Sequence, residues 1–398
     1  MQETGKYLPF YSCISTSGRH VTDFLPENMF KLFLHEYLHY LQNYGTIAGL
    51  QESYITLLRL YRIQEMENIE IPLFLSDIDI DGQVLKYKHS LGNKLTPFVG
   101  IKSIEISCNQ ELDLQICEIN QIDNSSFGFG LIHIQEGMAK ILEDLIFDEE
   151  NDLPINPYST VLEVVKFEYD YLLQDKILVF ALCEFCLNSD CETTIYFVHL
   201  LREMKRNKFE PTNTEEVFRF CQHTINGDFT KTYTNLGNTI SKYSSKLLEG
   251  FTEFQEYIEI THEKFAREKV DNLFFMTNWL EDYLIDKSND KFNILINKYN
   301  FPVFIDGYVY EKNETSEDFY VTKGQSENLL ALLPYYDIYN YLISGNSQSC
   351  SLFHLCNNKH KNNTCEHNVE YKLHEKDLEC PYTVVWRKRL ELDNKLGN

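Results

Sequence analysis

Two histidines and a glutamate in FLHEYLHYLQ, residues 33–42, have the types and spacing of a metal-binding site. On an α-helix, residues four apart lie one turn apart on the same face, so His35 and His39 could bind one metal ion. Glu36 could then act as a base on a water activated by that metal, without being a ligand itself. The alternative is a buried helix that holds these residues by chance. Burying them without partners would be costly, which favours the metal site.

The residues around this triplet predict a helix with a defined start and stop. Asp23 could cap it, Pro26 suits a first turn, and Gly45 fits just past its end. Apolar residues continue around the whole cylinder, so this helix is expected to be buried on most sides.

A catalytic zinc usually has three protein ligands and one open position. Gln42 and Gly45 exclude the metzincin pattern, which needs glycine and histidine there, and leave a glutamate from a second helix as the common solution. The best candidate is Glu136 in a predicted helix within residues 127–147, where Gly137 and Ala139 would allow a close approach to the first helix. Other acids remain open as the third ligand, namely Glu111, Glu163 and Glu184.

An outer carboxylate is also expected, because zinc-bound histidines usually donate their far N–H to one. Glu143 lies seven residues after Glu136 on the same helix face and could fill this role, with Asp144 as the alternative.

HExxH followed by a later helix reading EGMAKILED resembles the gluzincins, the thermolysin-like zinc peptidases. The resemblance covers about residues 25–150 and implies a zincin-like catalytic lobe. It also implies His35, His39 and Glu136 as zinc ligands and Glu36 as the catalytic base. The chain departs from this family in three ways. Only about 30 residues precede the first predicted helix, too few for the usual full upstream sheet. The gap from His39 to Glu136 is 97 residues, and Lys140 stands where thermolysin has an aspartate.

The remaining patterns predict an α+β fold with a small antiparallel sheet and a mostly helical second lobe. Alternating residues predict strands at 7–16, at 84–92, and at 98–120 as a hairpin turning near Asn109; an edge strand there could pair with a peptide substrate. Helical spacing predicts a helix at 53–66 and mostly helices from 158 to 283. We therefore expect a catalytic lobe over 1–150, a helical lobe over 151–290 and a mixed region over 291–398.

The helical lobe could supply a group that stabilises an oxyanion. The candidates are Tyr158, Tyr169 and His199, and the alternative for each is a packing role.

The cysteines fall into two groups. Cys183 and Cys186 lie in an apolar helix and are expected to be core residues rather than metal ligands. The polar tail could hold a second, structural zinc, which would explain how a segment with little core of its own folds. Its candidate ligands are Cys350, Cys356, Cys365 and Cys380, with His354, His360, His367 and His374 between them. Free thiols or a disulfide are the alternatives.

Composition limits the possible partners and location. The net charge of −24 excludes a general nucleic-acid binder, which needs a basic face. No leader and no apolar run of about 18 residues is found, so we expect no membrane contact. Eleven scattered cysteines are typical of reduced thiols, which predicts a cytoplasmic protein.

Together these features predict a zinc metallopeptidase that acts on a protein or peptide. A protease in the cytoplasm endangers its host, so narrow specificity or an activating partner is expected. Two alternatives stay open: a zincin-fold interaction or regulatory protein without hydrolysis, and a zinc amidase acting on a non-protein amide.

Overall fold

The computed structural model describes residues 5–8, 13–16, 27–79, 82–110, 113–147, 153–189, 192–225, 227–247, 252–287, 294–295, 298–299, 303–306, 333–346, 349–350, 365 and 380–396. These residues are mostly helical and include a small antiparallel sheet, as the α+β prediction expects. None of their helices is both long and apolar enough to cross a bilayer. One cluster of buried hydrophobic side chains runs from Phe33 to Leu392.

Five helices come first in the described part of the chain. They are α1 (Glu27–Gly45), α2 (Ile47–Glu65), α3 (Leu75–Ile78), α4 (Gly82–Ser90) and α5 (Leu131–Phe147). The helices that follow α5 are α6 (Ile155–Tyr158), α7 (Thr160–Tyr169), the 3₁₀ turn η1 (Asp170–Gln174), α8 (Lys176–Leu187), α9 (Thr193–Asn207), α10 (Thr214–Thr224), α11 (Phe229–Leu247), α12 (Thr252–Asp271) and α13 (Phe275–Asp286). This confirms the helical prediction for residues 158–283. Near the C-terminus lie α16 (Leu333–Ser344), α18 (Pro381–Val384), the π-helical turn η4 (Val385–Arg389) and α19 (Leu392–Lys395).

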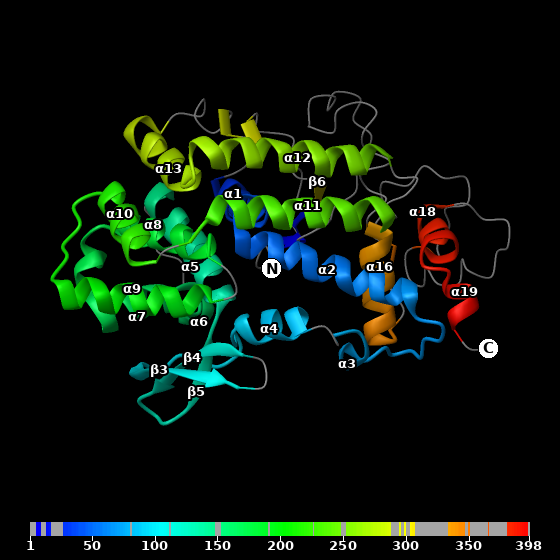
Figure 1. Cartoon of the computed structure of the whole chain (residues 1–398), viewed down its shortest axis with the longest axis horizontal. Coiled ribbons are helices and arrows are strands. Elements are labelled where there is room, and N and C mark those ends of the chain that lie inside the picture. Colours follow the sequence, from blue (N-terminus) through cyan, green and yellow to red (C-terminus); the bar gives the residue numbers. More distant parts are fainter. Residues whose placement is uncertain are drawn as a thin grey trace.

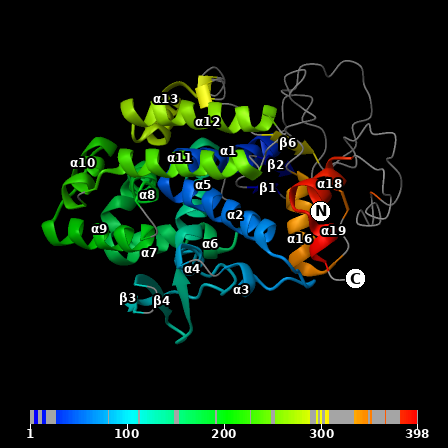
Figure 2. The same cartoon turned by 45° about the vertical axis from the view of Figure 1, so that its right-hand side comes forward.

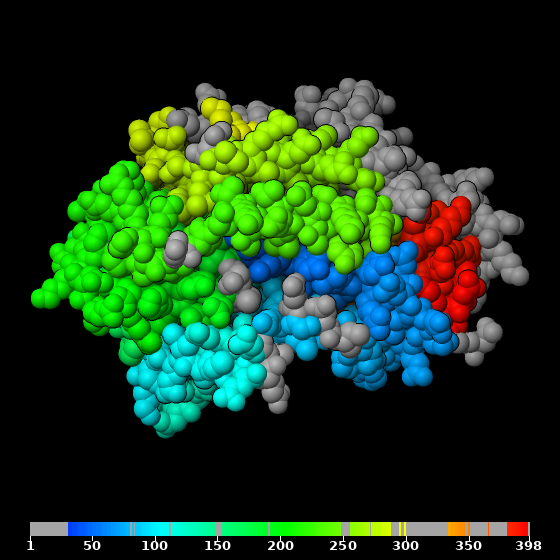
Figure 3. Space-filling model, viewed as in Figure 1, coloured from blue at the N-terminus to red at the C-terminus, as the bar shows by residue number. Residues whose placement is uncertain are grey.

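α1 is buried on nearly every side, as its continuous apolar surface predicts. Tyr37 and Tyr40 are fully buried, and the polar His35 and Glu36 that precede them are almost as inaccessible. α11 and α12 run side by side across the molecule, with α11 packed on α2 and α12 on α1 (Figure 1). In the space-filling view the dark-blue residues of this central segment appear only as a narrow strip beneath α11 (Figure 3).

The sequence predicted that Gly45 lies just past the end of α1, but Gly45 is the last residue of that helix and Thr46 fixes its end. The Thr46 hydroxyl donates to the Gln42 carbonyl (2.7 Å) and accepts from the Gly49 amide (3.1 Å), so one side chain ends α1 and begins α2. Gly45 is needed for packing instead. A Cβ at Gly45 would lie 2.6 Å from the ring of Phe275.

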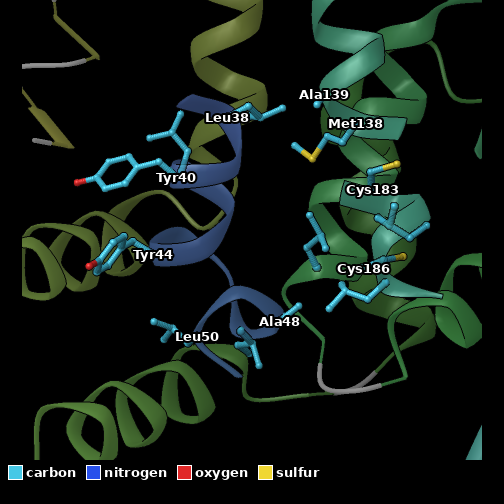
Figure 4. Packing of buried hydrophobic residues seen from close by; sticks show 14 of the residues in the cluster. Leu38, Tyr40, Tyr44, Ala48, Leu50, Met138, Ala139, Cys183 and Cys186 are labelled. Carbon is cyan, nitrogen blue, oxygen red and sulfur yellow. The ribbon is translucent and has the colours of Figure 1, made fainter. Parts of the chain in front are cut away.

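α5 packs against α1, α7 and α8. Leu38 of α1 points toward Met138 and Ala139 of α5 (Figure 4). Gly137 was predicted to let α5 approach α1, but the helix that it admits is a different one. A Cβ at Gly137 would lie 2.7 Å from Val161 Cγ2, so the glycine allows α7, not α1, to come close.

The antiparallel sheet has the order β3-β4-β5, from Ile101–Asn109, Leu114–Gln121 and Ser126–Phe129. Ile104 pairs with Ile119 and Asn109 with Leu114, which confirms the predicted hairpin. The strand predicted at 84–92 is wrong, because this segment forms α4. Its buried residues Val84 and Tyr87 are three apart and face one side of a helix that packs on α2.

A second, mixed sheet lies beside α1. β1 (Gly5–Leu8) pairs antiparallel with β2 (Cys13–Thr16), which pairs parallel with β6 (Val303–Asp306). Figure 2 shows these strands next to α1, and the backbones of β1 and β2 contact that helix. The strand structure predicted within residues 7–16 is thus confirmed in its described parts.

Candidate metal centre

His35, His39 and Glu136 converge on one point between α1 and α5. His35 Nε2 lies 3.2 Å from Glu136 Oε2 and 3.1 Å from His39 Nε2, and the third side of this triangle, His39 Nε2 to Glu136 Oε2, is 3.5 Å. These are the only three His, Cys, Asp or Glu side chains among the described residues that group in this way. The sequence therefore identified the three residues that the fold brings together.

The triangle is close to the size that a tetrahedral zinc requires: two sides, at 3.1 and 3.2 Å, are slightly short and the third, at 3.5 Å, matches. Zinc bonds of about 2.0–2.2 Å at tetrahedral angles place the donor atoms roughly 3.3–3.6 Å apart. Two imidazole nitrogens and one carboxylate oxygen are also the donor types that zinc prefers in catalytic sites. The donor set and its spacing fit a zinc ion with one position left open.

Each histidine also has an acceptor at its far nitrogen. His35 Nδ1 donates to Glu143 Oε1 at 2.8 Å, and His39 Nδ1 donates to Gln42 Oε1 at 2.8 Å. With hydrogen on both Nδ1 atoms, both Nε2 lone pairs are directed at the cluster. Of the two predicted outer carboxylates, Glu143 takes this position. Asp144 instead pairs with the ammonium groups of Lys140 and Lys176.

The charges of this cluster favour a cation. Burial disfavours the charged imidazole of His35, but the carboxylates of Glu136 and Glu143 outweigh it and raise its pKa to about 10. Burial likewise opposes the charged form of His39, and Glu136 still raises its pKa. Burial alone would raise the pKa of Glu136, yet the two histidines hold it well below its usual range. A divalent metal would replace the protons that these groups otherwise retain.

Glu36 is buried beside the cluster, 6 % exposed. Its negative charge is among the influences that raise the pKa values of both histidines and of Tyr158, which places it close to all three groups. A base that acts on a metal-bound water has to lie near these groups.

Tyr158 of α6 is the predicted oxyanion candidate that lies near the cluster. The centre of its ring is 6.2 Å from that of His35. Burial, followed by the charges of Glu136, Glu36 and Glu143, raises the pKa of its phenol to about 12, so the hydroxyl remains a hydrogen-bond donor at neutral pH. A buried network holds the start of α6, because His133 Nε2 donates to Asn156 Oδ1 at 2.9 Å.

The other predicted oxyanion candidates lie elsewhere. The Tyr169 hydroxyl donates to the carbonyl of Phe209 at 2.8 Å, and His199 is exposed on α9. Neither is brought to the histidines.

The alternative third ligands have other positions too. Glu184 accepts from the amides of Met276 and Thr277 at the start of α13, at 3.1 and 2.7 Å, and Glu163 lies 3.8 Å from Lys166. Glu111 lies outside the described residues.

Cys183 and Cys186 are fully buried free thiols in α8, and burial raises the pKa of each, which confirms their core role (Figure 4). In the tail, the Cys350 amide donates to the Cys365 carbonyl at 2.8 Å, and Cys380 precedes α18. Cys356 and the four tail histidines lie outside the described residues. A structural zinc in the tail stays a prediction.

The contact of Gln42 with His39 was not predicted from the sequence, where Gln42 served only to exclude the metzincin pattern. Its position three residues after His39 is the signal that could have found it, since that spacing places both on one face.

The chain matches no protein-family model, and no curated protein or solved structure shows significant similarity to it. Inference about function therefore starts from the cluster itself.

Proposed function

We propose that this protein is a zinc-dependent peptidase of the zincin type. The observation that carries the proposal is the triangle of His35 Nε2, His39 Nε2 and Glu136 Oε2, with sides of 3.1–3.5 Å and the buried Glu36 beside it. His35, His39 and Glu136 would hold the zinc. When bound, the ion would polarise the scissile carbonyl and lower the pKa of a water molecule toward neutrality.

The chain's own residues supply the remaining chemistry. Glu36 would take the proton of the attacking water and pass it to the leaving amine, so no covalent intermediate is needed. Tyr158, which stays protonated at neutral pH, would donate a hydrogen bond to the oxygen of the scissile carbonyl as negative charge develops there. Glu143 and Gln42 would keep the two histidines in their ligating tautomers.

The burial of the cluster supports a restricted choice of substrates. His35 and Glu36 are 7 % and 6 % exposed, and His39 and Glu136 are only partly accessible. A peptide would have to reach a centre enclosed by α1 and α5, so we expect few sequences to be cleaved, with a regulatory partner as one means of access.

The test combines zinc content with peptide cleavage. Elemental analysis should find zinc on the purified chain and on Glu36→Gln, and should find it lost from His39→Ala and Glu136→Ala. Glu163→Gln, which changes a surface carboxylate next to Lys166, is the matched control and should behave as the natural chain does. Glu36→Gln should lower turnover of a peptide library about 10²–10⁴-fold while it retains zinc.

Three outcomes would contradict the proposal in different ways. If the natural chain binds no zinc even after zinc is supplied, the protein is not a zinc-dependent peptidase. Zinc retained by Glu136→Ala would exclude Glu136 as the third ligand. Bound zinc without cleavage of any peptide would favour the interaction protein or an amidase acting on a non-protein amide.

A further inference from the structure

Gln42 connects the two helices that carry the candidate ligands. Its side chain is fully buried on α1, one turn after His39. Its Oε1 lies 2.8 Å from His39 Nδ1, and its Nε2 lies 3.2 Å from the backbone carbonyl of Gln135 on α5. Gln135 directly precedes Glu136, so one amide bridges from the second histidine to the neighbour of the third ligand.

These two contacts determine the protonation of His39. A backbone carbonyl can only accept, so the Gln42 end that faces Gln135 must be the NH₂ group. The end that faces His39 must then be the carbonyl oxygen, which also only accepts. In its neutral form, the one that can bind a metal, His39 therefore carries its hydrogen on Nδ1 and presents the lone pair of Nε2 to the cluster.

We propose that Gln42 is the positioning residue of the metal centre: it fixes the ligating tautomer of His39 and sets the spacing of α1 and α5 at Glu136. This inference rests on the proposed function, since it assigns Gln42 its role toward the same zinc. Glu52 on α2 is a further neighbour of this corner: burial raises the pKa of its carboxyl, and the Gln135 side chain and His39 oppose that rise.

The two histidines are thus supported differently. His35 donates to the carboxylate of Glu143, and His39 donates to a neutral amide. A carboxylate could still accept from His39 Nδ1, but it has no hydrogen for the Gln135 carbonyl. Gln42→Glu consequently separates the two roles, because it keeps the acceptor for the ligand and loses the donor for the helix bridge.

The experiment measures zinc dissociation constants of the full-length chain by competition with a chelator, next to urea unfolding of the zinc-free forms. Gln42→Leu, which removes both contacts, should weaken zinc binding about 10–100-fold. Gln42→Glu should bind zinc about as tightly as the natural chain but should unfold at lower urea.

Asn43→Leu is the matched control. This neighbouring buried amide joins α1 to α2 by donating to the Gly49 carbonyl at 2.9 Å and accepting from the Ser53 hydroxyl at 3.2 Å. It should lower stability and leave zinc affinity unchanged. If Gln42→Leu does not fold, Gln42→Met takes its place, because this side chain has a similar length but neither an N–H for Gln135 nor a carbonyl for His39, and it should weaken zinc binding in the same direction.

Equal zinc affinity in the natural chain and in Gln42→Leu or Gln42→Met would overturn the positioning role alone, with the peptidase proposal intact. The same loss in Asn43→Leu would also overturn it, because the effect would then follow from packing. A natural chain without zinc would instead remove the proposed function, and this inference with it.

Discussion

His35 Nδ1 lies 2.8 Å from Glu143 Oε1, although the two residues are 108 positions apart in the chain. The carboxylate is buried and its second oxygen lies 4.0 Å from Lys31 Nζ. An anion in this place orients the imidazole and makes its other nitrogen a better donor.

Glu143→Ala should therefore weaken zinc binding about 10–100-fold, because His35 loses the group that fixes its tautomer. Asp144→Ala is the matched control, since this neighbouring carboxylate pairs with Lys140 and Lys176 instead. It should leave zinc affinity unchanged. Chelator competition measures both, and equal losses in the two variants would contradict a role for Glu143 at the metal.

Tyr158→Phe should lower kcat on a cleaved peptide about a hundredfold, because one donor to the developing oxyanion is lost. Zinc content should not change, since the hydroxyl is not a ligand. Tyr169→Phe serves as the comparison, because its hydroxyl bonds the Phe209 carbonyl and should cost only about 1 kcal/mol of stability. A Tyr158→Phe variant with unchanged kcat would exclude the oxyanion role.

Gly137→Ala should destabilise the fold by about 1–3 kcal/mol, because the new methyl group would lie 2.7 Å from Val161 Cγ2. In a Val161→Ala background the same change should cost little or even stabilise, since alanine is the better helix former. Urea unfolding of the four chains in this double-mutant cycle measures the coupling. Purely additive costs would show that α5 and α7 do not meet at Gly137.

His262 should make stability fall in acid. Burial lowers the pKa of its imidazole to about 4, and its Nδ1 has no hydrogen-bond partner among the described residues. Below its ordinary value of about 6.5, the unfolded chain takes up a proton that the folded chain refuses, so stability is lost between about pH 6.5 and pH 4.

Urea unfolding at pH 7 and pH 5 tests this. The natural chain should lose about 2 kcal/mol more than His262→Phe over that interval, because the phenylalanine does not titrate. The same loss in both chains would mean that His262 is protonated in the folded state or accessible to water.

The candidate ligands could be predicted from the sequence because local rules determine them. His35 and His39 share a face on any regular helix, and an apolar surface on all sides of that helix implied burial. Glu136 was predicted because it precedes the small residues Gly137 and Ala139 in a second apolar helix, and because an E-G-x-A helix after HExxH resembles the gluzincins. The correct helix for residues 53–66 and the hairpin at 98–120 follow from the same local periodicity.

The errors arose where tertiary contacts decide. Residues 84–92 alternate in polarity, yet Val84 and Tyr87 also have helical spacing, and packing on α2 selects the helix. Gly45 was predicted to end α1, and Gly137 was predicted to let α5 approach α1. In the structure, Gly45 instead leaves room for the ring of Phe275 and Gly137 leaves room for Val161. Neither partner is near in sequence, so no local pattern could identify it.

Between α1 and α5 lie about 85 residues, and those of them that the structure describes form helices and a sheet but give no ligand to the triangle. We therefore expect the length of this segment to vary between relatives that keep the same metal-binding geometry. A relative would be recognised by two short fingerprints, whatever their separation. One is His-Glu-x-x-His-x-x-Gln, in which the glutamine orients the second histidine. The other is Glu-Gly followed by a glutamate seven residues after the first, in which the glycine admits a neighbouring helix and the last carboxylate supports the first histidine.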